Sequence, residues 1–500
     1  MRIRWSRRTR QYAARVGLSV LLVALAACGT RLPDSAFVEA DQGPTGARAA
    51  GARTPSSATP GASGAAASSA TSSAAQTGPA AAGGAATNGS AGAADGPNQA
   101  SDVGVSENEI VIGNITAQNG ILGAAFRPPL LGLQAYVDYI NDHGGVHGRT
   151  IRLETCDDKE DRTRTLQCAQ DLVENKHVFA FIANNTRAEG GAAPYINSQG
   201  VPVVDVPITN APYRYPHYFS IYGTRCPRDG NTVCGNDQSD NTSGIYRWFK
   251  QNLGVTKAAV FYYSGVAESE QAANFTQKGL QLEGYSVSMY GVILGNPSFD
   301  QAVQQMQSNG TQIIFDTVDD GANRKLCDTM QRYKFSVPAK VSTVVAYGDA
   351  VGTDFSDVCR NSVYITGTTV TYSDTSNPGV AAFRDAFATY QPGAQLHQWS
   401  LEGWGAGLML TDYLNTAGAT PTRAGFEQWL NSLQDYTYDG LTAPISYQPG
   451  DVHAPTVRDC FTIAQWQDSV GGWIQRTAAP GYECYDDAIQ FRTPVSERGD

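Results

Sequence analysis

Short apolar runs alternate with helical stretches between residues 109 and 210, and this alternation constrains the fold more than any other feature of the chain. Ile110 to Ile115 is short and apolar, as in a strand buried on both faces of a sheet. Pro128 and Pro129 suit the first turn of the helix that follows, and Gly144 and Gly145 suit its end. The expected strands continue at 150–155, 178–182 and 201–204, and the expected helices at 162–175 and 188–198. Alternation of this kind predicts a parallel sheet with right-handed crossovers.

A second α/β unit is expected after a connecting segment at 213–223, because a chain of 500 residues is too long for one hydrophobic core. Its predicted strands are 257–263, 286–293, 311–316, 339–346 and 363–371, and its predicted helices are 243–253, 268–283, 298–309 and 323–333. Three more helices are expected at 380–390, 400–415 and 421–430, before a β-rich tail with short strands at 445–447 and 460–466. Gly403, Gly405 and Gly407 fall inside the second of these helices, which indicates that another element packs closely against it.

The N-terminus has the features of a segment that directs export. Six Arg accompany an apolar stretch, Val16 to Ala27, whose 12 residues are too few for a bilayer, where about 20 are needed. The stretch ends in Leu25-Ala26-Ala27-Cys28, which resembles the bacterial lipobox; the alternative is an ordinary secretory signal. We therefore expect 1–27 to be a lipoprotein signal peptide and Cys28 to carry the lipid at the outer face of the bacterial cell membrane. Residues 28–105, rich in Ala, Gly, Ser and Pro, are expected to form a disordered tether.

Charge and cysteine content limit the partners and the compartment. Without residues 1–27, which hold six Arg and no acid, 30 Lys plus Arg stand against 47 Asp plus Glu, a net charge of −17. A strongly acidic surface argues against nucleic acid or anionic lipid as a partner. The eight Cys besides Cys28 fall into local pairs, which indicates disulfides formed outside the cytoplasm, and other pairings are open. The expected disulfides are Cys156–Cys168, Cys226–Cys234, Cys327–Cys359 and Cys460–Cys484.

Four segments of the sequence together resemble a known family. They are Glu109 to Gly113, Tyr136 to Gly148, Asp157-Asp158 and Val201 to Val204. The pattern is similar to the type I periplasmic binding fold, in particular to the leucine/isoleucine/valine-binding proteins of ABC importers, from about residue 106 to 473. The resemblance implies an α/β fold of two lobes, each a three-layer α/β sandwich around a parallel sheet, joined by a three-segment hinge. Lobe one would comprise 106–222 with 372–440, and lobe two 223–371 with 441–500.

Ligands of parallel α/β sheets bind beyond the carboxyl ends of the strands, where the first unit has loops at 116–126, 183–187 and 205–210. The candidate ligand-binding residues lie in these loops or at the carboxyl ends of strands in the second unit. They are Gln118, Asn119, Asn184, Asn185, Thr186, Ile208, Thr209, Tyr263, Asp319 and Asp320. The resemblance implies that Thr186 and the backbone groups of Ile208 and Thr209 hold a ligand carboxylate. It also implies that an acid of lobe two, Asp319 or Asp320, meets a ligand ammonium. The alternative is that these side chains only cap helices or are solvated, and that the ligand is not an α-amino acid.

The sequence indicates no catalytic group, cofactor or metal site. His143 and His147 have the spacing of a helical zinc pair, but Gly144 and Gly145 between them indicate a turn. No P-loop, dinucleotide-binding or serine-hydrolase motif occurs between 106 and 500. The expected function is capture of a small polar solute, an amino acid or a related amide or acid, for an ABC permease of the branched-chain amino acid type. The alternatives are a ligand sensor for a membrane receptor or kinase and a secreted amidase-type enzyme.

Overall fold

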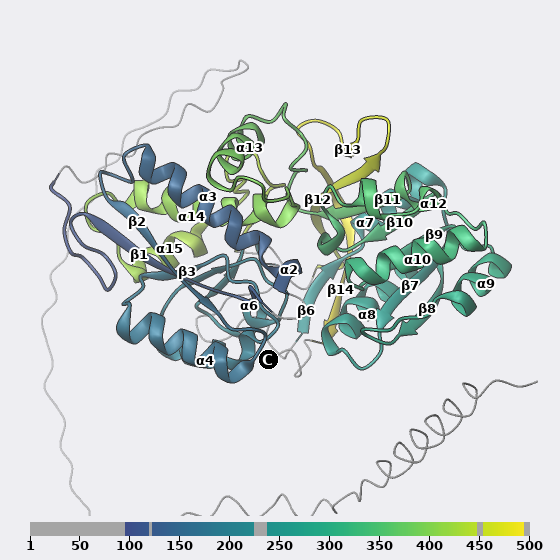
Figure 1. Cartoon of the computed structure of the whole chain (residues 1–500), viewed down its shortest axis with the longest axis horizontal. Coiled ribbons are helices and arrows are strands. Elements are labelled where there is room, and N and C mark those ends of the chain that lie inside the picture. Colours follow the sequence, from purple (N-terminus) through teal and green to yellow (C-terminus); the bar gives the residue numbers. More distant parts are fainter. Residues whose placement is uncertain (1–95, 120–122, 225–237, 448–453, 495–500) are drawn as a thin grey trace, which may run out of the picture. The chain divides into compact units, whose positions relative to one another are not determined.

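The computed structural model describes residues 96–119, 123–224, 238–447 and 454–494. The predicted signal peptide, Cys28, most of the predicted tether and the predicted disulfide Cys226–Cys234 lie outside these residues. Within them, two β-sheets each carry helices on their faces (Figure 1). None of the described helices is both long and apolar enough to cross a bilayer.

The first sheet has five parallel strands in the order β2-β1-β3-β4-β5. They are β1 (Glu109–Thr116), β2 (Thr150–Asp157), β3 (Ala180–Ile182), β4 (Val203–Asp205) and β5 (Tyr218–Ser220). In the centre, Ile112 lies opposite Leu153 on one side and Ala180 on the other. The strand order reverses between β1 and β3, which is where sheets of this kind bind ligands.

Helices cover both faces of the first sheet. On one face lie α3 (Pro128–Asp142), α13 (Pro378–Tyr390) and α14 (Gln398–Ala417), and on the other lie α4 (Arg162–Gln170) and α5 (Ala193–Ser198). Successive side chains of β1 point to opposite faces, so Ile110 and Ile112 enter the first core while Val111 and Ile115 enter the second. The helix predicted at 188–198 is shorter than expected, because a 3₁₀ turn, Glu189–Gly191, precedes α5.

Helices α3 and α14 approach each other backbone to backbone. A Cβ atom on Gly403 would lie 1.9 Å from the carbonyl oxygen of Pro129, and one on Gly132 would lie 1.8 Å from that of Ser400. No larger residue fits at either position without moving a helix. The close packing that the glycines of the predicted helix indicated is therefore confirmed.

The second sheet repeats the strand order of the first and then extends it. Its parallel part, in the order β8-β7-β9-β10-β11, consists of β7 (Lys257–Tyr263), β8 (Ser286–Val292), β9 (Ile313–Asp316), β10 (Ala339–Ser342) and β11 (Val363–Gly367). Beyond β11 the described strands are antiparallel: β12 (Thr456–Gln467), β14 (Glu483–Pro494) and β6 (Gln238–Thr242), with β13 (Gly472–Gln475) beside β12. The sequence predicted only 460–466 of this edge, and the strand predicted at 445–447 is reduced to one bridge between Ile445 and Tyr436.

Helices α7 (Gly244–Leu253) and α8 (Ala267–Leu282) cover one face of the second sheet, and α9 (Asp300–Asn309) and α10 (Asp320–Arg332) cover the other. We call the first sheet with its helices lobe one, and the second sheet with its helices lobe two. The predicted class, a two-lobe α/β fold, is confirmed, with the antiparallel edge of lobe two as an addition. The exact residue boundaries of the two lobes remain a prediction.

Three segments connect the lobes and hydrogen-bond to one another. They include 221–224, 368–372 and 441–447. The backbone N–H of Val370 donates to Leu441 O at 2.9 Å, and that of Ala443 donates to Thr368 O at 2.7 Å. These bonds explain why the strand predicted to reach residue 371 ends at Gly367: beyond it the backbone pairs with the third crossing. We call the three segments the hinge.

Three disulfides occur within the described residues, and each matches a predicted pair. Cys156–Cys168 links the end of β2 to α4, and Cys327–Cys359 links α10 to the short helix α12 (Asp357–Arg360). Cys460–Cys484 links the antiparallel strands β12 and β14. Each bond therefore joins neighbouring elements within one lobe.

Candidate binding site

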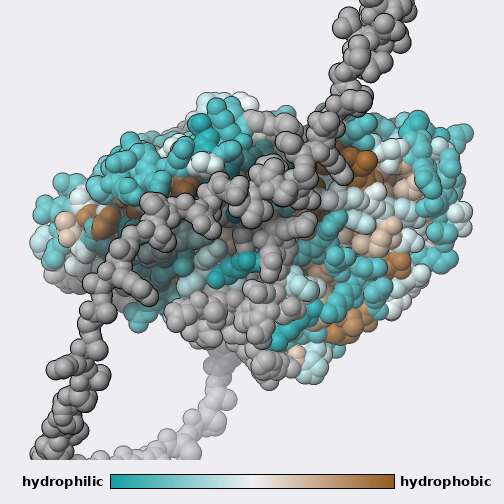
Figure 2. Space-filling view, turned by 90° about the horizontal axis from the view of Figure 1, so that it is seen from below, coloured by the Kyte–Doolittle hydropathy of each residue, from teal (hydrophilic) through white to brown (hydrophobic). Residues whose placement is uncertain are grey.

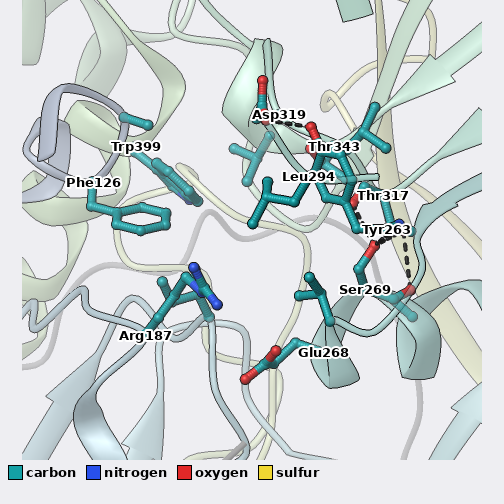
Figure 3. A pocket seen from close by; sticks show the side chains of 16 residues that line it. Phe126, Arg187, Tyr263, Glu268, Ser269, Leu294, Thr317, Asp319, Thr343 and Trp399 are labelled. Carbon is teal, nitrogen blue, oxygen red and sulfur yellow. Dashed lines mark hydrogen bonds between the residues drawn. The ribbon is translucent and has the colours of Figure 1, made fainter. Parts of the chain in front are cut away.

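A cavity of about 270 Å³ is lined by residues of both lobes. Lobe one contributes Phe126 after β1, Arg187 after β3, Ile208 after β4 and Trp399 at the start of α14. Lobe two contributes Tyr263 at the end of β7, Leu294 after β8, Thr317 to Asp319 after β9, and Thr343 and Val344 after β10 (Figure 3). Nearly all of these positions follow the carboxyl end of a parallel strand, which is where the topology predicts a ligand.

The cavity wall is mostly apolar and contains three charged residues, one cation and two acids. The Phe126 and Trp399 rings lie 6.1 Å apart between centroids, on the side of lobe one. Of the residues lining this cavity, all within the described part, Arg187 is the one cation, and its guanidinium points into the cavity (Figure 3). Arg187 also forms a long ion pair with Glu160, with 3.8 Å between Nη1 and Oε2. Glu268, in the first turn of α8, lies near Arg187 at the lower edge of the view (Figure 3).

The predicted acid Asp319 lies at the opposite end of the cavity from Arg187 (Figure 3). Its carboxylate caps α10 by accepting from the N–H of Ala322 at 3.0 Å, and it also accepts from the Tyr263 hydroxyl. Burial, and then this bond to Asp319, raise the pKa of Tyr263, which is therefore a neutral donor. Asp320 does not line the cavity and pairs instead with Arg324.

The polar turn after β3 holds lobe one together. Asn184 Oδ1 accepts from the N–H of Ile115 at 2.8 Å, and Asn185 Nδ2 donates to Val206 O at 2.8 Å. Thr186 Oγ1 donates to Asp158 Oδ2 at 2.6 Å. Since all three side chains are buried and bonded to neighbouring segments, they fix the loop that presents Arg187.

Gln118, Asn119 and Thr209 also bond within lobe one. The backbone N–H of Gln118 and the amide of Asn119 donate to Asp157 at 2.9 and 2.6 Å, and the Thr209 hydroxyl donates to Glu189. Of the ten predicted ligand-binding residues, Ile208, Tyr263 and Asp319 line the cavity and the other seven do not. Contact of any of the ten with a ligand remains a prediction.

Several lining residues were not predicted, and their sequence signals differ. Arg187 ends the loop 183–187 that was predicted to face the ligand, so its charge alone could have singled it out. Trp399 had no such signal, because it lies in α14, far along the chain from the loops that were predicted to face the ligand. Within the described residues, no group of three or more His, Cys, Asp or Glu is placed to hold a metal ion.

Two α/β lobes with the same strand order, three connecting segments and a cavity between the lobes define the architecture of a type I periplasmic binding protein. The sequence profile of the family described as "Periplasmic binding protein" matches residues 109–471, and the chain belongs to this family. The resemblance drawn from the sequence is thus confirmed at the level of family and fold.

Individual relatives are distant. The chain is 23% identical over 205 residues to "Leu/Ile/Val-binding protein homolog 1" of Brucella melitensis, a match that covers 40% of this chain and 51% of that protein. The chain therefore spans about half the length of the curated relatives it matches.

Solved structures share the fold at low identity. One is the fatty acid ABC transporter substrate-binding protein from Thermomonospora curvata, with a TM-score of 0.59, 16% identity and coverage of 80% of this chain and 95% of that one. Another is the solute binding protein of an ABC transporter from Rhodopseudomonas palustris BisB5 in complex with 3,4-dihydroxy benzoic acid, with a TM-score of 0.56, 16% identity and coverage of 78% and 99%. At this identity the likeness shows the fold alone.

Proposed function

We propose that this chain is the extracytoplasmic substrate-binding protein of an ABC importer and captures a small organic solute between its lobes. The observation that carries the proposal is the cavity whose wall both lobes share. A ligand there touches both lobes at once, so its binding favours closure about the hinge. Leu294 lines the cavity and is 40% exposed, and its neighbour Ile293 is 71% exposed. Closure that covers these apolar side chains would add to the stability of the closed form.

The cavity lining favours a solute with a carboxylate and an apolar body. A guanidinium such as that of Arg187 binds a carboxylate through two parallel hydrogen bonds. The rings of Phe126 and Trp399 and the side chain of Leu294 offer apolar contact to the rest of the solute. Leucine, isoleucine, valine, fatty acids and 3,4-dihydroxybenzoic acid, which the names of the similar proteins mention, all carry a carboxyl group. An amino acid or a related acid is therefore the proposed ligand class.

The proposal also includes a location and a partner, which the sequence and the family support. Lipid on Cys28 would hold the protein at the outer face of the cell membrane, and residues 28–105 would let it reach a permease of the branched-chain amino acid type. The role needs no catalytic group, since capture and release of the solute involve no covalent change.

A ligand screen with a matched pair of variants tests the proposal. A thermal-shift panel of amino acids, their deaminated acids and aromatic acids should contain a stabilising solute, since a ligand at 100 times its dissociation constant stabilises by about 2.7 kcal/mol. Arg187→Gln should weaken binding of that solute by about tenfold to a hundredfold, because a hydrogen bond to a charged group contributes about 1.5–3 kcal/mol. Arg162→Gln, the same change at an exposed position of lobe one, should not alter the affinity.

Two results would count against the proposal. If no solute in the panel stabilises the wild-type protein, the solute-binding role is rejected. If the solute binds equally well to Arg187→Gln, the role stands and the carboxylate contact is rejected.

A further inference from the structure

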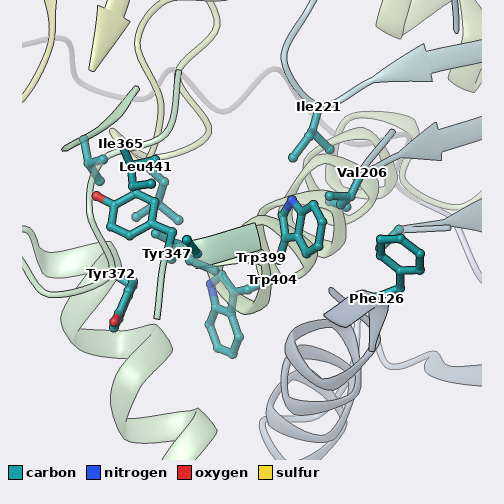
Figure 4. Close-up of a cluster of buried hydrophobic side chains, with 14 of the residues drawn as sticks. Phe126, Val206, Ile221, Tyr347, Ile365, Tyr372, Trp399, Trp404 and Leu441 are labelled. Carbon is teal, nitrogen blue, oxygen red and sulfur yellow. The ribbon is translucent and has the colours of Figure 1, made fainter. Parts of the chain in front are cut away.

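A second cavity, also of about 270 Å³, adjoins the first beside the hinge. The two cavities share Ile208, Val344 and Trp399 in their walls, so they are neighbouring parts of one cleft. The Trp399 ring lies beside Val206 and Phe126 in the buried cluster (Figure 4). Tyr347 and Ile365 line the side of the second cavity that faces the hinge. We call this space the hinge cavity.

Of the described residues that line the hinge cavity, Glu402 is the only charged one. It lies on α14 and is 3% exposed. Its Oε2 accepts from the Tyr222 hydroxyl of the first crossing at 2.7 Å, and its Oε1 accepts from Thr369 Oγ1 of the second crossing at 2.8 Å. A carboxylate has about four acceptor positions, so two hydroxyl donors leave part of its capacity unused.

The surroundings of Glu402 differ from those of the buried acid in lobe two. There the Asp316 carboxylate pairs with the Lys340 ammonium at 2.8 Å, and both side chains are fully buried. Glu402 has no such cation in the wall of its cavity. A buried carboxylate without a counter-charge is unfavourable, and a cation that enters the cavity would relieve the cost.

The wall of the hinge cavity contains a second polar group without a hydrogen bond to a described residue, the hydroxyl of Thr368. The hydroxyl oxygen of Thr368 is buried and has no hydrogen-bond partner within the described structure. Buried polar atoms of native proteins are usually bonded, so an orphaned hydroxyl in the same cavity wall as an incompletely bonded carboxylate indicates a place for a polar ligand group. An ammonium has three N–H donors and one positive charge, which fits both groups.

We propose that the hinge cavity is a subsite for a protonated amine of the solute, which donates to Glu402 and Thr368. This inference rests on the proposed function and extends it, since it assigns the solute an amine as well as the carboxylate at Arg187. Because Glu402 contacts two of the three crossings, an amine bound there is held where the lobes meet. An inorganic monovalent cation carries the same charge, so the experiment must separate the two.

The groups around Glu402 allow a test by pH. Tyr222 faces it from the hinge, Tyr347 from lobe two and Tyr438 from the segment of lobe one just before the third crossing. Burial raises the pKa of each of these tyrosines, so they stay neutral. Burial raises the pKa of Glu402 itself to about 7. A bound ammonium favours the ionised carboxylate, so binding should release a proton near neutral pH and should weaken as the pH falls below about 7.

Two matched sets of probes are measured by titration calorimetry at pH 6 and pH 8. The first is leucine, isocaproate, which lacks the amine, and isoamylamine, which lacks the carboxylate; the second is phenylalanine, hydrocinnamate and phenethylamine. For Glu402→Gln the amine-bearing probes should lose at least tenfold in affinity and should lose their dependence on pH. The two acids without amines should change less than twofold.

Control variants keep the outcomes distinct. Glu268→Gln removes the acid near Arg187, and if it weakens the amines while Glu402→Gln does not, the subsite belongs to Glu268 and the proposal is overturned. Thr368→Val should weaken amines by a factor of two to five, and it provides the same test if Glu402→Gln does not fold.

Three further outcomes would each reject the amine subsite. If the acids bind but the amines gain nothing from Glu402, the solute-binding role stands and the amine subsite is rejected. If sodium or potassium chloride stabilises the wild type but not Glu402→Gln, and amines do not compete, the cavity takes an inorganic cation and the amine proposal is rejected. If none of the probes binds, the amine subsite is rejected, and the wider thermal-shift panel decides on the solute-binding role.

Discussion

Glu402 illustrates how the surroundings of one side chain set its chemistry. Nothing in the local sequence distinguishes Glu402 from the other residues of its helix. The fold nevertheless buries it among tyrosines, threonines and the Trp399 ring. Arg187 shows the converse, because a charged residue at the end of a polar turn faces a largely apolar cavity. Both side chains gain their proposed roles from the residues that the fold places around them, most of which are distant in the sequence.

The ionisation of Glu402 should make the unliganded protein less stable as the pH rises. Below about pH 4.5 the group is protonated in both states, and between pH 4.5 and 7 it ionises in the unfolded chain while burial keeps it protonated in the folded one. Stability is therefore lost across this interval, by on the order of 3 kcal/mol at most, since one pKa unit corresponds to 1.36 kcal/mol. Urea unfolding of the wild type and Glu402→Gln from pH 4.5 to 8 measures the difference.

Only the difference between the two proteins reports on Glu402. The buried carboxyl of Asp205 also has a pKa raised by burial and by Glu189, and it titrates in both proteins alike. Parallel stability curves for the wild type and the variant would show that Glu402 does not change its ionisation on folding.

At the scale of elements, the contact between α3 and α14 fixes the core of lobe one. The two helices meet at glycines, and a methyl group on Gly403 would overlap the carbonyl oxygen of Pro129. Since α14 also carries Trp399 and Glu402, its position relative to the sheet decides where the walls of both cavities lie. Packing within lobe one thus determines the geometry of the binding site.

Gly403→Ala should destabilise the protein although alanine favours helices. Overpacking a close contact typically costs about 1–3 kcal/mol, which exceeds the gain of about 1 kcal/mol in helix propensity. Gly472→Ala is the control, because a Cβ atom there meets no atom within 4 Å. Thermal unfolding should show a lower midpoint for Gly403→Ala and little change for the control, and an unchanged midpoint for both would mean that α14 shifts without strain.

At the scale of the whole molecule, the chain combines a two-lobe binding unit with an N-terminal segment of different composition. The three disulfides of the described residues each stay within a lobe, so they stabilise the lobes without restricting the hinge. The visible surface is mostly hydrophilic, with apolar residues in separate patches (Figure 2). Such a surface suits contact with water, which the predicted tether would require.

Anchoring through Cys28 makes a prediction about the whole molecule. Cys28→Ala removes the thiol that would carry the lipid, so the variant should appear in the medium while the wild type stays with the membrane fraction. Fractionation and immunoblotting measure the distribution, and the control is the double variant Cys156→Ala/Cys168→Ala, which removes a disulfide of lobe one and leaves no new free thiol. Retention of the Cys28→Ala protein on the membrane would exclude the lipid anchor.

Much of the fold could be read from local patterns. The strand predicted at 110–115 is observed at Glu109–Thr116, and the helix predicted at 400–415 is observed at Gln398–Ala417. Strand β6 could not be predicted, because the segment Gln238–Thr242 is entirely polar and becomes a strand only by pairing with β14 at the other end of the chain. For the site, the loops at the carboxyl ends of the strands were predicted, but which of their side chains face the cavity was not.

The sequence by itself determined the two α/β units and the order of most strands and helices, and it indicated the three disulfide pairs that the described residues contain. These features depend on hydrophobic periodicity, turn residues and spacing, which are local properties of a chain. Only the tertiary structure decided that Thr186 bonds to Asp158 while Arg187 faces the cavity, and that Glu402 lies where two hinge crossings meet. Those outcomes depend on contacts between residues far apart in the chain, because hydrogen-bond partners and buried surroundings are set by the packing of whole elements.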